Sequence, residues 1–295
     1  MEEITIVITS IAYAVVLIIT APLVAAIIKI SKARMQNRRG PGLLQVYYDL
    51  FKLLQKDSMV SPTASWIFAV APFVYFSGAF GAATLLSGGD LFALLYLLAA
   101  GRFFLALASL DTGSTFGGMG GSRELYISVL VEPVLLLTML TVAARAGSTK
   151  LAAMSAVAAI TPFSLPYLLA AMAFLIILVT ETGRIPVDNP DTHLELTMIH
   201  EAMVLEYSGR RLGLIFLASA CKQLVFILLF VVLFLPWQPG ELSPVMAAVW
   251  LSAKVLITAV ALAAIETSTN KMRLFKVPGF MGLAGMLALL ALVAQ

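Results

Sequence analysis

Four ionisable side chains stand inside long apolar stretches of this sequence, where a charge is costly. They are Arg102, Glu132, Lys222 and Lys254. Each costs about 2.5–3.5 kcal/mol at the centre of a membrane helix, so such residues face the interior of a bundle, where they pair with one another or line water. Acids and bases held together in this way can pass protons. We therefore predict a proton relay, and internal salt bridges that only fix helix packing are the alternative.

The densest run of carboxylates follows the fifth apolar stretch, between residues 181 and 206. The pattern predicts a helix over residues 192–209. At 100° per residue, Glu195 and Glu206 share one face of this helix, whereas Glu201 points away from both. We predict a carboxylate-lined passage that runs from the cytoplasmic surface toward the buried charges. The alternative is a solvated acidic helix.

These side chains must be positioned by a membrane-embedded helical bundle. The chain has 295 residues, of which 61% are hydrophobic and 12% charged, and its mean hydropathy is +0.99. Soluble domains contain roughly 45–50% apolar and about 25% charged residues, so a soluble globular domain is excluded. We predict an all-α polytopic fold in a single transmembrane domain, residues 1–295. Its eight expected spans are 4–30, 66–86, 91–110, 124–144, 163–181, 212–235, 246–265 and 279–294.

The basic residues gather in alternate connections between these spans. The positive-inside rule therefore places the connections 31–65, 111–123, 182–211 and 266–278 in the cytoplasm. We expect a multi-pass protein of the cell inner (plasma) membrane with both termini on the outer side. The glycine-rich segment from Gly113 to Gly121 is expected to be a flexible cytoplasmic loop.

The first connection contains an amphipathic segment at residues 43–56. A helix there places Leu43, Val46, Tyr47 and Leu50 on one apolar stripe, together with Leu54. We predict an interfacial helix on the cytoplasmic surface, and a short soluble connector is the alternative.

No metal or redox cofactor is expected in this chain. Its one cysteine, Cys221, cannot form a disulfide framework, hold an iron–sulfur cluster or build a cysteine-based metal site. The spacing of His193, His200 and Glu201 matches no recognised metal motif. Any redox cofactor therefore belongs to a partner. The formal net charge of +3 is too mild to indicate nucleic acid.

Several short motifs resemble subunit 1 of respiratory complex I and its relatives in membrane-bound group 4 nickel–iron hydrogenases. The motifs are Arg39-Gly40-Pro41, Gln45 with Asp49, Lys52-Leu53 with Lys56, Glu181-Thr-x-Arg184-x-Pro186-x-Asp188, Glu195-Leu196 and Glu206-Tyr207. A second group is similar to the membrane subunit of formate hydrogenlyase and favours the hydrogenase branch. It comprises Leu110-Asp111-Thr112-Gly113-Ser114, Gly121-Ser122-Arg123-Glu124 and Val131-Glu132-Pro133.

The resemblance implies eight or more membrane helices and a large peripheral arm docked on the cytoplasmic connections. That arm, built from hydrogenase-like large and small subunits, would carry the iron–sulfur clusters and, where the complex is a true hydrogenase, a nickel–iron centre. Antiporter-like membrane subunits would continue a proton path from this chain. The path residues implied by the resemblance are Glu132, Glu181, Asp188, Glu195, Glu201 and Glu206. Burial cost adds Lys222 and Lys254, and the orienting or docking cations are Arg39, Arg102, Arg123 and Arg184.

The leading hypothesis is a non-catalytic, proton-path subunit that anchors a hydrogenase module. A first alternative is the quinone-site subunit of a complex I type oxidoreductase, which requires an apolar chamber between the interfacial helix and spans one and six. A second is a stand-alone ion transporter, which the lack of internal repeats disfavours. A third is a passive anchor in which the buried charges are only salt bridges.

Overall fold

The computed structural model describes residues 2–160, 164–189, 198–237 and 243–295. Within these ranges the chain is helical without strands, so the predicted all-α polytopic fold is confirmed. The described residues contain seven helices that are long and apolar enough to cross a membrane. They are α1 (Glu2–Met35), α3 (Trp66–Leu85), α4 (Leu91–Asp111), α5 (Thr115–Ala146), α9 (Gly209–Phe234), α10 (Pro244–Ser268) and α11 (Val277–Val293), the last preceded by the short helix η1 (Leu274–Lys276). The predicted span 163–181 contains a shorter helix, α7 (Leu165–Glu181).

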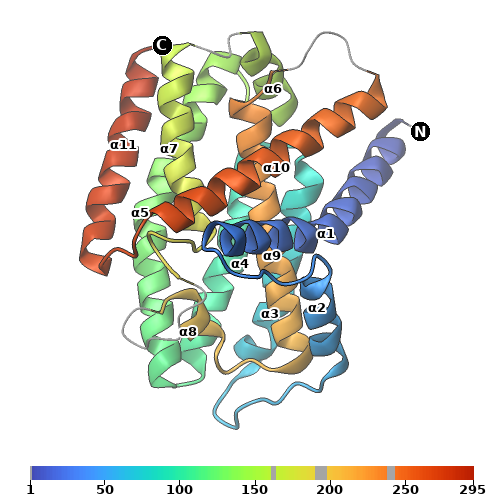
Figure 1. The fold of residues 1–295 in the computed structure, drawn as a ribbon, viewed down its shortest axis with the longest axis vertical. Helices are drawn as coiled ribbons and strands as arrows, with labels where there is room; N and C mark the ends of the chain where they lie inside the picture. Colours follow the sequence, from blue (N-terminus) through green and yellow to red (C-terminus); the bar gives the residue numbers. More distant parts are fainter. Residues whose placement is uncertain (1, 161–163, 190–197, 238–242) are drawn as a thin grey trace.

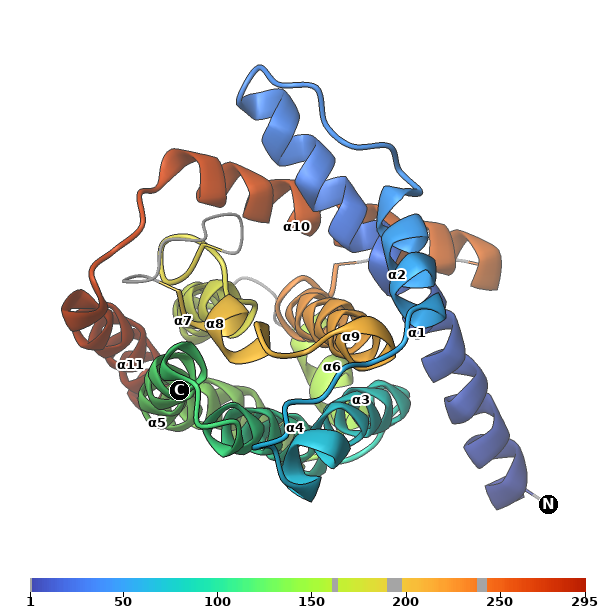
Figure 2. The same cartoon turned by 90° about the horizontal axis from the view of Figure 1, so that it is seen from below.

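The long helices form two groups by direction. The helices α3, α4, α5, α7, α9 and α11 run along the long axis of the molecule and are seen nearly end-on in Figure 2. The helices α1 and α10 run obliquely and pack against one another on one flank (Figures 1 and 2). Lys32, near the C-terminal end of α1, thereby lies beside Glu266, near the C-terminal end of α10.

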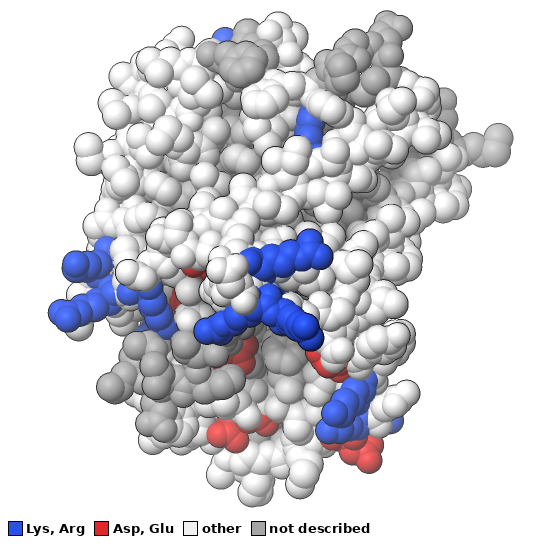
Figure 3. Space-filling model, in the orientation of Figure 1, with Lys and Arg blue, Asp and Glu red and all other residues white. Residues whose placement is uncertain are grey.

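Charged residues gather at one end of the bundle. On the face shown in Figure 3, Lys, Arg, Asp and Glu occupy the lower half, whereas the upper half is largely uncharged. The lower half also contains the short helices α2 (Gln45–Gln55) and α8 (His200–Val204), and the upper end contains α6 (Leu151–Ile160) and the C-terminus (Figure 1). The apolar upper part is the part suited to a bilayer.

The expected loop from Gly113 to Gly121 is wrong. Helix α5 begins at Thr115, and the hydroxyl of Ser114 caps it by accepting a hydrogen bond from the backbone N–H of Gly117 at 3.1 Å. A Cβ at Gly120 would lie 2.8 Å from Cβ of Ala202 in α8 and 2.9 Å from the backbone oxygen of Ile199. The glycines therefore allow neighbouring helices to approach closely, which a sequence pattern cannot distinguish from a flexible loop.

Two glycines of α5 form a matched pair for testing this close approach. Gly120→Ala is expected to displace α8 and lower the stability by about 1–3 kcal/mol, because a methyl group would overlap the backbone of α8. Gly118→Ala fills open space and should raise the stability by up to about 1 kcal/mol. Thermal unfolding of the detergent-solubilised protein measures both. Equal effects of the two substitutions would show that α8 does not pack tightly here.

The predicted amphipathic helix is α2. Leu50 is its buried residue, and Leu53 and Leu54 lie against Gly213 of α9. The Tyr47 hydroxyl donates to the backbone oxygen of Ile19 in α1 at 2.5 Å. Helix α2 therefore packs against both the first and the sixth predicted span.

The helix expected over residues 192–209 is wrong in its extent. Residues 190–197 lie outside the described part of the chain, and α8 ends at Val204. The ring of Tyr207 stacks on Phe68 at 4.0 Å, and its hydroxyl donates to the Phe68 backbone oxygen at 3.0 Å. Burial raises the pKa of this hydroxyl well above its ordinary value, so the hydroxyl stays protonated. These contacts draw the chain toward α3 and leave Glu206 outside the helix.

Candidate functional site

The site begins where α7 ends. Gly183 has φ 60° and closes the helix: its N–H donates to the Thr180 oxygen at 3.1 Å, and the N–H of Arg184 donates to the Val179 oxygen at 3.1 Å. This is the hydrogen-bond pattern of a Schellman motif, which favours glycine. With 17 residues, α7 spans about 25 Å, less than the roughly 30 Å of a bilayer core. Its last residue, Glu181, meets residues near the middle of the longer helices α4 and α9.

Glu181 joins two cations that come from different helices. Its side chain is 3% exposed, its Oε1 accepts from Arg102 Nη1 at 2.5 Å, and its Oε2 lies 2.7 Å from Lys222 Nζ. Arg102 and Lys222 stand near the middle of α4 and α9. A buried carboxylate shared by two cations is the centre of the site.

Arg102 extends this cluster to Glu132. Its Nη2 donates to Glu132 Oε1 at 2.7 Å. The expectation that Glu132 is buried is wrong, because its side chain is 46% exposed on the flank of α5. The result is one chain of four side chains, Lys222–Glu181–Arg102–Glu132, which crosses α9, α7, α4 and α5. Two positive and two negative groups balance one another along it.

Lys254 does not take part in this chain. Its Nζ donates to the backbone oxygen of Leu235 at 2.6 Å and lies 5.9 Å from the centre of the Trp250 ring. The oblique course of α10 carries Lys254 away from the other charges. The position of Lys254 in the sequence does not reveal that it lies apart from the other charges.

A cavity of about 320 Å³ adjoins the four-residue chain. Residues of α1, α2, α3, α4, α5, α7, α8 and α9 line it, and hydrophobic side chains such as Leu50, Leu105 and Ile127 contribute. Its ionisable lining residues are Lys29, Asp49, Arg102, Glu124, Glu181, Arg184, Asp188, His200, Glu201 and Lys222. The cavity therefore connects the interfacial helix with the buried ion pairs.

The structure brings together most, but not all, of the site residues that the sequence predicted. Glu181, Asp188, Glu201 and Lys222 line the cavity with Arg102 and Arg184, and Glu132 joins through Arg102. Glu195 lies outside the described residues. Four others are not among the lining residues: Lys254, Glu206, Arg39 and Arg123. Of these, Glu206 and Arg39 are exposed, and Arg123 Nη1 donates to the Met198 oxygen at 2.8 Å beside α8.

Asp188 holds three segments together. Its Oδ1 lies 2.9 Å from Lys271 Nζ, and its Oδ2 accepts from the backbone N–H of His200, the first residue of α8, at 3.1 Å. The N–H of Met272 donates to the Pro186 oxygen at 2.8 Å. The segment after α7 is thus fastened both to α8 and to the connection that follows α10.

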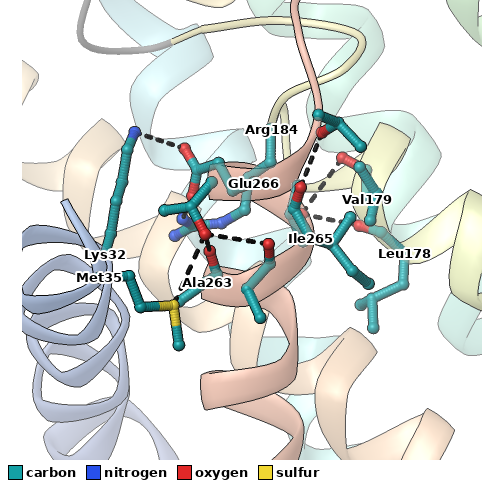
Figure 4. A network of polar contacts seen from close by, with 12 residues as sticks. Lys32, Met35, Leu178, Val179, Arg184, Ala263, Ile265 and Glu266 are labelled. Carbon is teal, nitrogen blue, oxygen red and sulfur yellow. Dashed lines mark hydrogen bonds and ion pairs between the residues drawn. The ribbon is translucent and has the colours of Figure 1, made fainter.

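Glu266 was missed by the sequence analysis. Its side chain is 1% exposed, with Oε1 2.7 Å from Lys32 Nζ and Oε2 2.8 Å from Arg184 Nη1 (Figure 4). It stands one residue beyond the expected span 246–265 and is the first residue of the expected cytoplasmic connection 266–278. An acid at the very end of an apolar run is the one signal that could have identified it. Asp49 and Glu124 also line the cavity; the sequence analysis named both in motifs but did not assign them to the proton path.

The carboxylates, lysines and histidine of the cavity are groups that can bind and release protons. The described residues contain no group of three or more His, Cys, Asp or Glu that could hold a metal ion. Within the described part of the chain, the buried donor Gln223 Nε2 has no hydrogen-bond partner, and Gln223 lines the cavity beside Lys222.

Comparisons with known proteins agree over nearly the whole chain. The family model described as NADH dehydrogenase matches residues 7–294. Formate hydrogenlyase subunit 4 of Escherichia coli (strain K12) is 36% identical over 277 residues, which cover 88% of this chain and 89% of that protein. Hydrogenase-4 component C of the same organism is 39% identical over 251 residues, covering 80% of this chain and 78% of that protein.

A solved structure shares the fold. It is a chain of the membrane-bound sulfane sulfur reductase, described as an archaeal respiratory membrane complex. The TM-score is 0.83 at 20% identity, over 97% of this chain and 100% of that chain.

Proposed function

Because this chain belongs to the NADH dehydrogenase family, we propose that it is the membrane-anchoring, proton-path subunit of an energy-converting complex of the hydrogenase type. The sequence resemblance to complex I subunit 1 and to formate hydrogenlyase membrane subunits is confirmed by the relatives. Their names support the hydrogenase branch for this multi-pass membrane protein. We place its charged end in the cytoplasm and both termini on the outer side of the cell inner membrane, as the basic residues favour.

The chain of charges beside the cavity supports this proposal most directly. Glu181 compensates two cations at once, so its charge cannot change without disturbing both Arg102 and Lys222. A redox reaction at the cytoplasmic end changes the charge of the cavity carboxylates. Arg102 then transmits that change to Glu132 on the flank of the bundle. Ion movement is thereby linked to a reaction outside the chain.

We assign the cofactors and the chemistry to partners. Peripheral hydrogenase-like large and small subunits dock on the cytoplasmic end and carry iron–sulfur clusters, with a nickel–iron centre where the complex is a true hydrogenase. Antiporter-like membrane subunits cover the flank that exposes Glu132. The exposure of the Glu132 carboxyl group, 46% on a membrane-spanning helix, supports this placement, because lipid does not solvate polar or charged groups. Nickel content and hydrogen evolution of the complex that copurifies with the tagged chain test the assignment, and absence of both would contradict it.

Two glutamates close together in sequence test the proton path. Glu201→Gln in the reconstituted complex is expected to lower ion movement per turnover about 10²-fold, the contribution of one positioned proton donor, because Glu201 lines the cavity. Glu206→Gln is the control, since Glu206 is exposed and does not line the cavity. Redox turnover and acidification of liposomes are measured together. Equal ion movement in the two variants would reject the passage.

The cavity also supports a second candidate function, a quinone site. It lies among α1, α2 and α9, where the quinone alternative requires a chamber, and its volume of about 320 Å³ lies at the lower end for small-molecule pockets. Inhibition of the complex by quinone-site inhibitors would favour this function. Insensitivity, together with hydrogen evolution, would favour the hydrogenase type.

A further inference from the structure

The segment after α7 is held against the end of α10. We call residues 182–189 the cavity loop, because Thr182, Gly183, Arg184, Val187 and Asp188 all line the cavity. Three contacts fasten it to residues of α10 and the following connection. They are Arg184 Nη1 to Glu266 Oε2 at 2.8 Å, Lys271 Nζ to Asp188 Oδ1 at 2.9 Å, and the Met272 N–H to the Pro186 oxygen at 2.8 Å.

The two oxygens of Glu266 have different partners. Oε1 meets Lys32 of α1, so it joins the two oblique helices; Oε2 meets Arg184, so it reaches the cavity loop (Figure 4). Arg184 lines the cavity, whereas Lys32 is not among its lining residues. Glu266 itself lies behind the loop and does not line the cavity.

Lys32, Arg184 and Glu266 form a buried cluster, so the loss of any one contact is costly. The side chains of Lys32, Arg184 and Glu266 are 13%, 12% and 1% exposed. Removing one partner of a buried ion pair leaves a charge that water does not compensate. Among the described residues, Arg184 Nε is buried without a hydrogen-bond partner, and Glu266 is the ion-pair partner that holds this guanidinium.

We propose that Glu266 is a positioning residue for the cavity: it holds Arg184, and with it the cavity loop, in a place set by the packing of α1 against α10. Because α1 also lines the cavity through Ala25 and Lys29, a shift of α1 relative to α10 moves one wall and the charges of the loop together. The geometry of this coupling does not depend on the ion carried. Its effect on ion movement rests on the proposed function.

Labelling of a buried loop residue tests the geometry in the intact complex. Val187 is 3% exposed, and Val187→Cys in a Cys221→Ala background reports opening of the cavity loop to a water-soluble maleimide. Glu266→Gln and Arg184→Gln are each expected to raise the labelling rate about tenfold or more, because each breaks the same contact. Lys32→Gln is the matched control and should stay within about twofold, since the Glu266–Arg184 pair remains.

The pattern across variants separates positioning from general damage. The double variant Glu266→Gln with Arg184→Gln should label no faster than the faster single variant, because both changes act through one contact. Labelling of Lys32→Gln as fast as Glu266→Gln, or an unchanged rate in Glu266→Gln and Arg184→Gln, would overturn the proposal. If the Glu266→Gln variant does not assemble, the labelling rate of Arg184→Gln alone tests the proposal. This variant leaves Glu266 paired with Lys32, so the remaining pair has no net charge.

The same variants distinguish this inference from the proposed function. Maleimide labelling needs no turnover. If the labelling rates are as expected but ion movement per turnover is unchanged, only the proposed proton path is rejected. Reduced ion movement in Glu266→Gln and Arg184→Gln, with normal movement in Lys32→Gln, would support both.

Discussion

Glu181→Gln is expected to abolish coupled ion movement and to lower the stability by about 3–5 kcal/mol, the cost of breaking a buried pair. The amide leaves Arg102 and Lys222 without their shared anion in an environment where only 3% of the Glu181 side chain is exposed. Glu132 remains as an ion-pair partner for Arg102. Most of the lost stability therefore comes from Lys222, which loses its ion pair with Glu181. Thermal unfolding of the purified complex and acidification of liposomes during redox turnover measure the two effects.

A second change separates the two effects of losing Glu181. Glu181→Gln combined with Lys222→Met removes the cation that the single variant leaves unpaired, so most of the stability should return. Ion movement should stay abolished, because the carboxylate is still missing. Wild-type stability and coupling in Glu181→Gln alone would show that the cluster has neither role. Recovery of ion movement in the double variant would show that Glu181 is only a brace.

Glu132→Gln is expected to give the opposite balance, a large functional loss with little change in stability. Because the amide can still accept a hydrogen bond from Arg102 and Arg102 keeps its bond to Glu181, the stability should change by no more than about 1 kcal/mol. Ion movement per turnover should fall about 10²-fold or more, since Glu132 is the end of the four-residue chain at the flank. Assembly is checked by copurification and coupling by liposome acidification.

The outcome for Glu132→Gln also tests the passive-anchor alternative. If the charges only brace the helices, the variant should lose subunits before it loses coupling. An assembled complex whose redox turnover continues without ion movement would exclude that alternative. Glu206→Gln, a neutralised carboxylate outside the cavity, supplies the reference for an assembled and coupled variant.

The membrane fold and part of the site were predictable from sequence because they depend on local composition. An apolar run of about 20 residues has one stable solution in lipid, a helix, whatever its neighbours are. A charge within such a run is costly anywhere in the bundle, which is why Arg102, Glu132 and Lys222 could be identified without a structure. The acidic stretch containing Glu181 and Asp188 was recognisable by motif.

Other parts of the site depend on contacts between segments that are far apart in the sequence. A run of glycines indicates conformational freedom in a single chain, but three of them let helices approach closely: Gly117 and Gly121 lie against α4, and Gly120 lies against α8. Glu201 and Glu206 belong to the same acidic stretch of the sequence, in which a continuous helix would place them on different faces. Packing of Tyr207 on Phe68 ends α8 between them and leaves only Glu201 at the cavity.

The apolar pattern determined by itself that this chain is a helical membrane protein with acids and bases at lipid depth, because transfer of side chains into lipid is a local property. The tertiary structure alone decided which of those groups meet. The short α7 brings Glu181 to Arg102 and Lys222, while the oblique α10 carries Lys254 away and sets Glu266 between Lys32 and Arg184. Ion pairing acts over a few ångströms, and helix length and crossing direction, not sequence separation, set those distances.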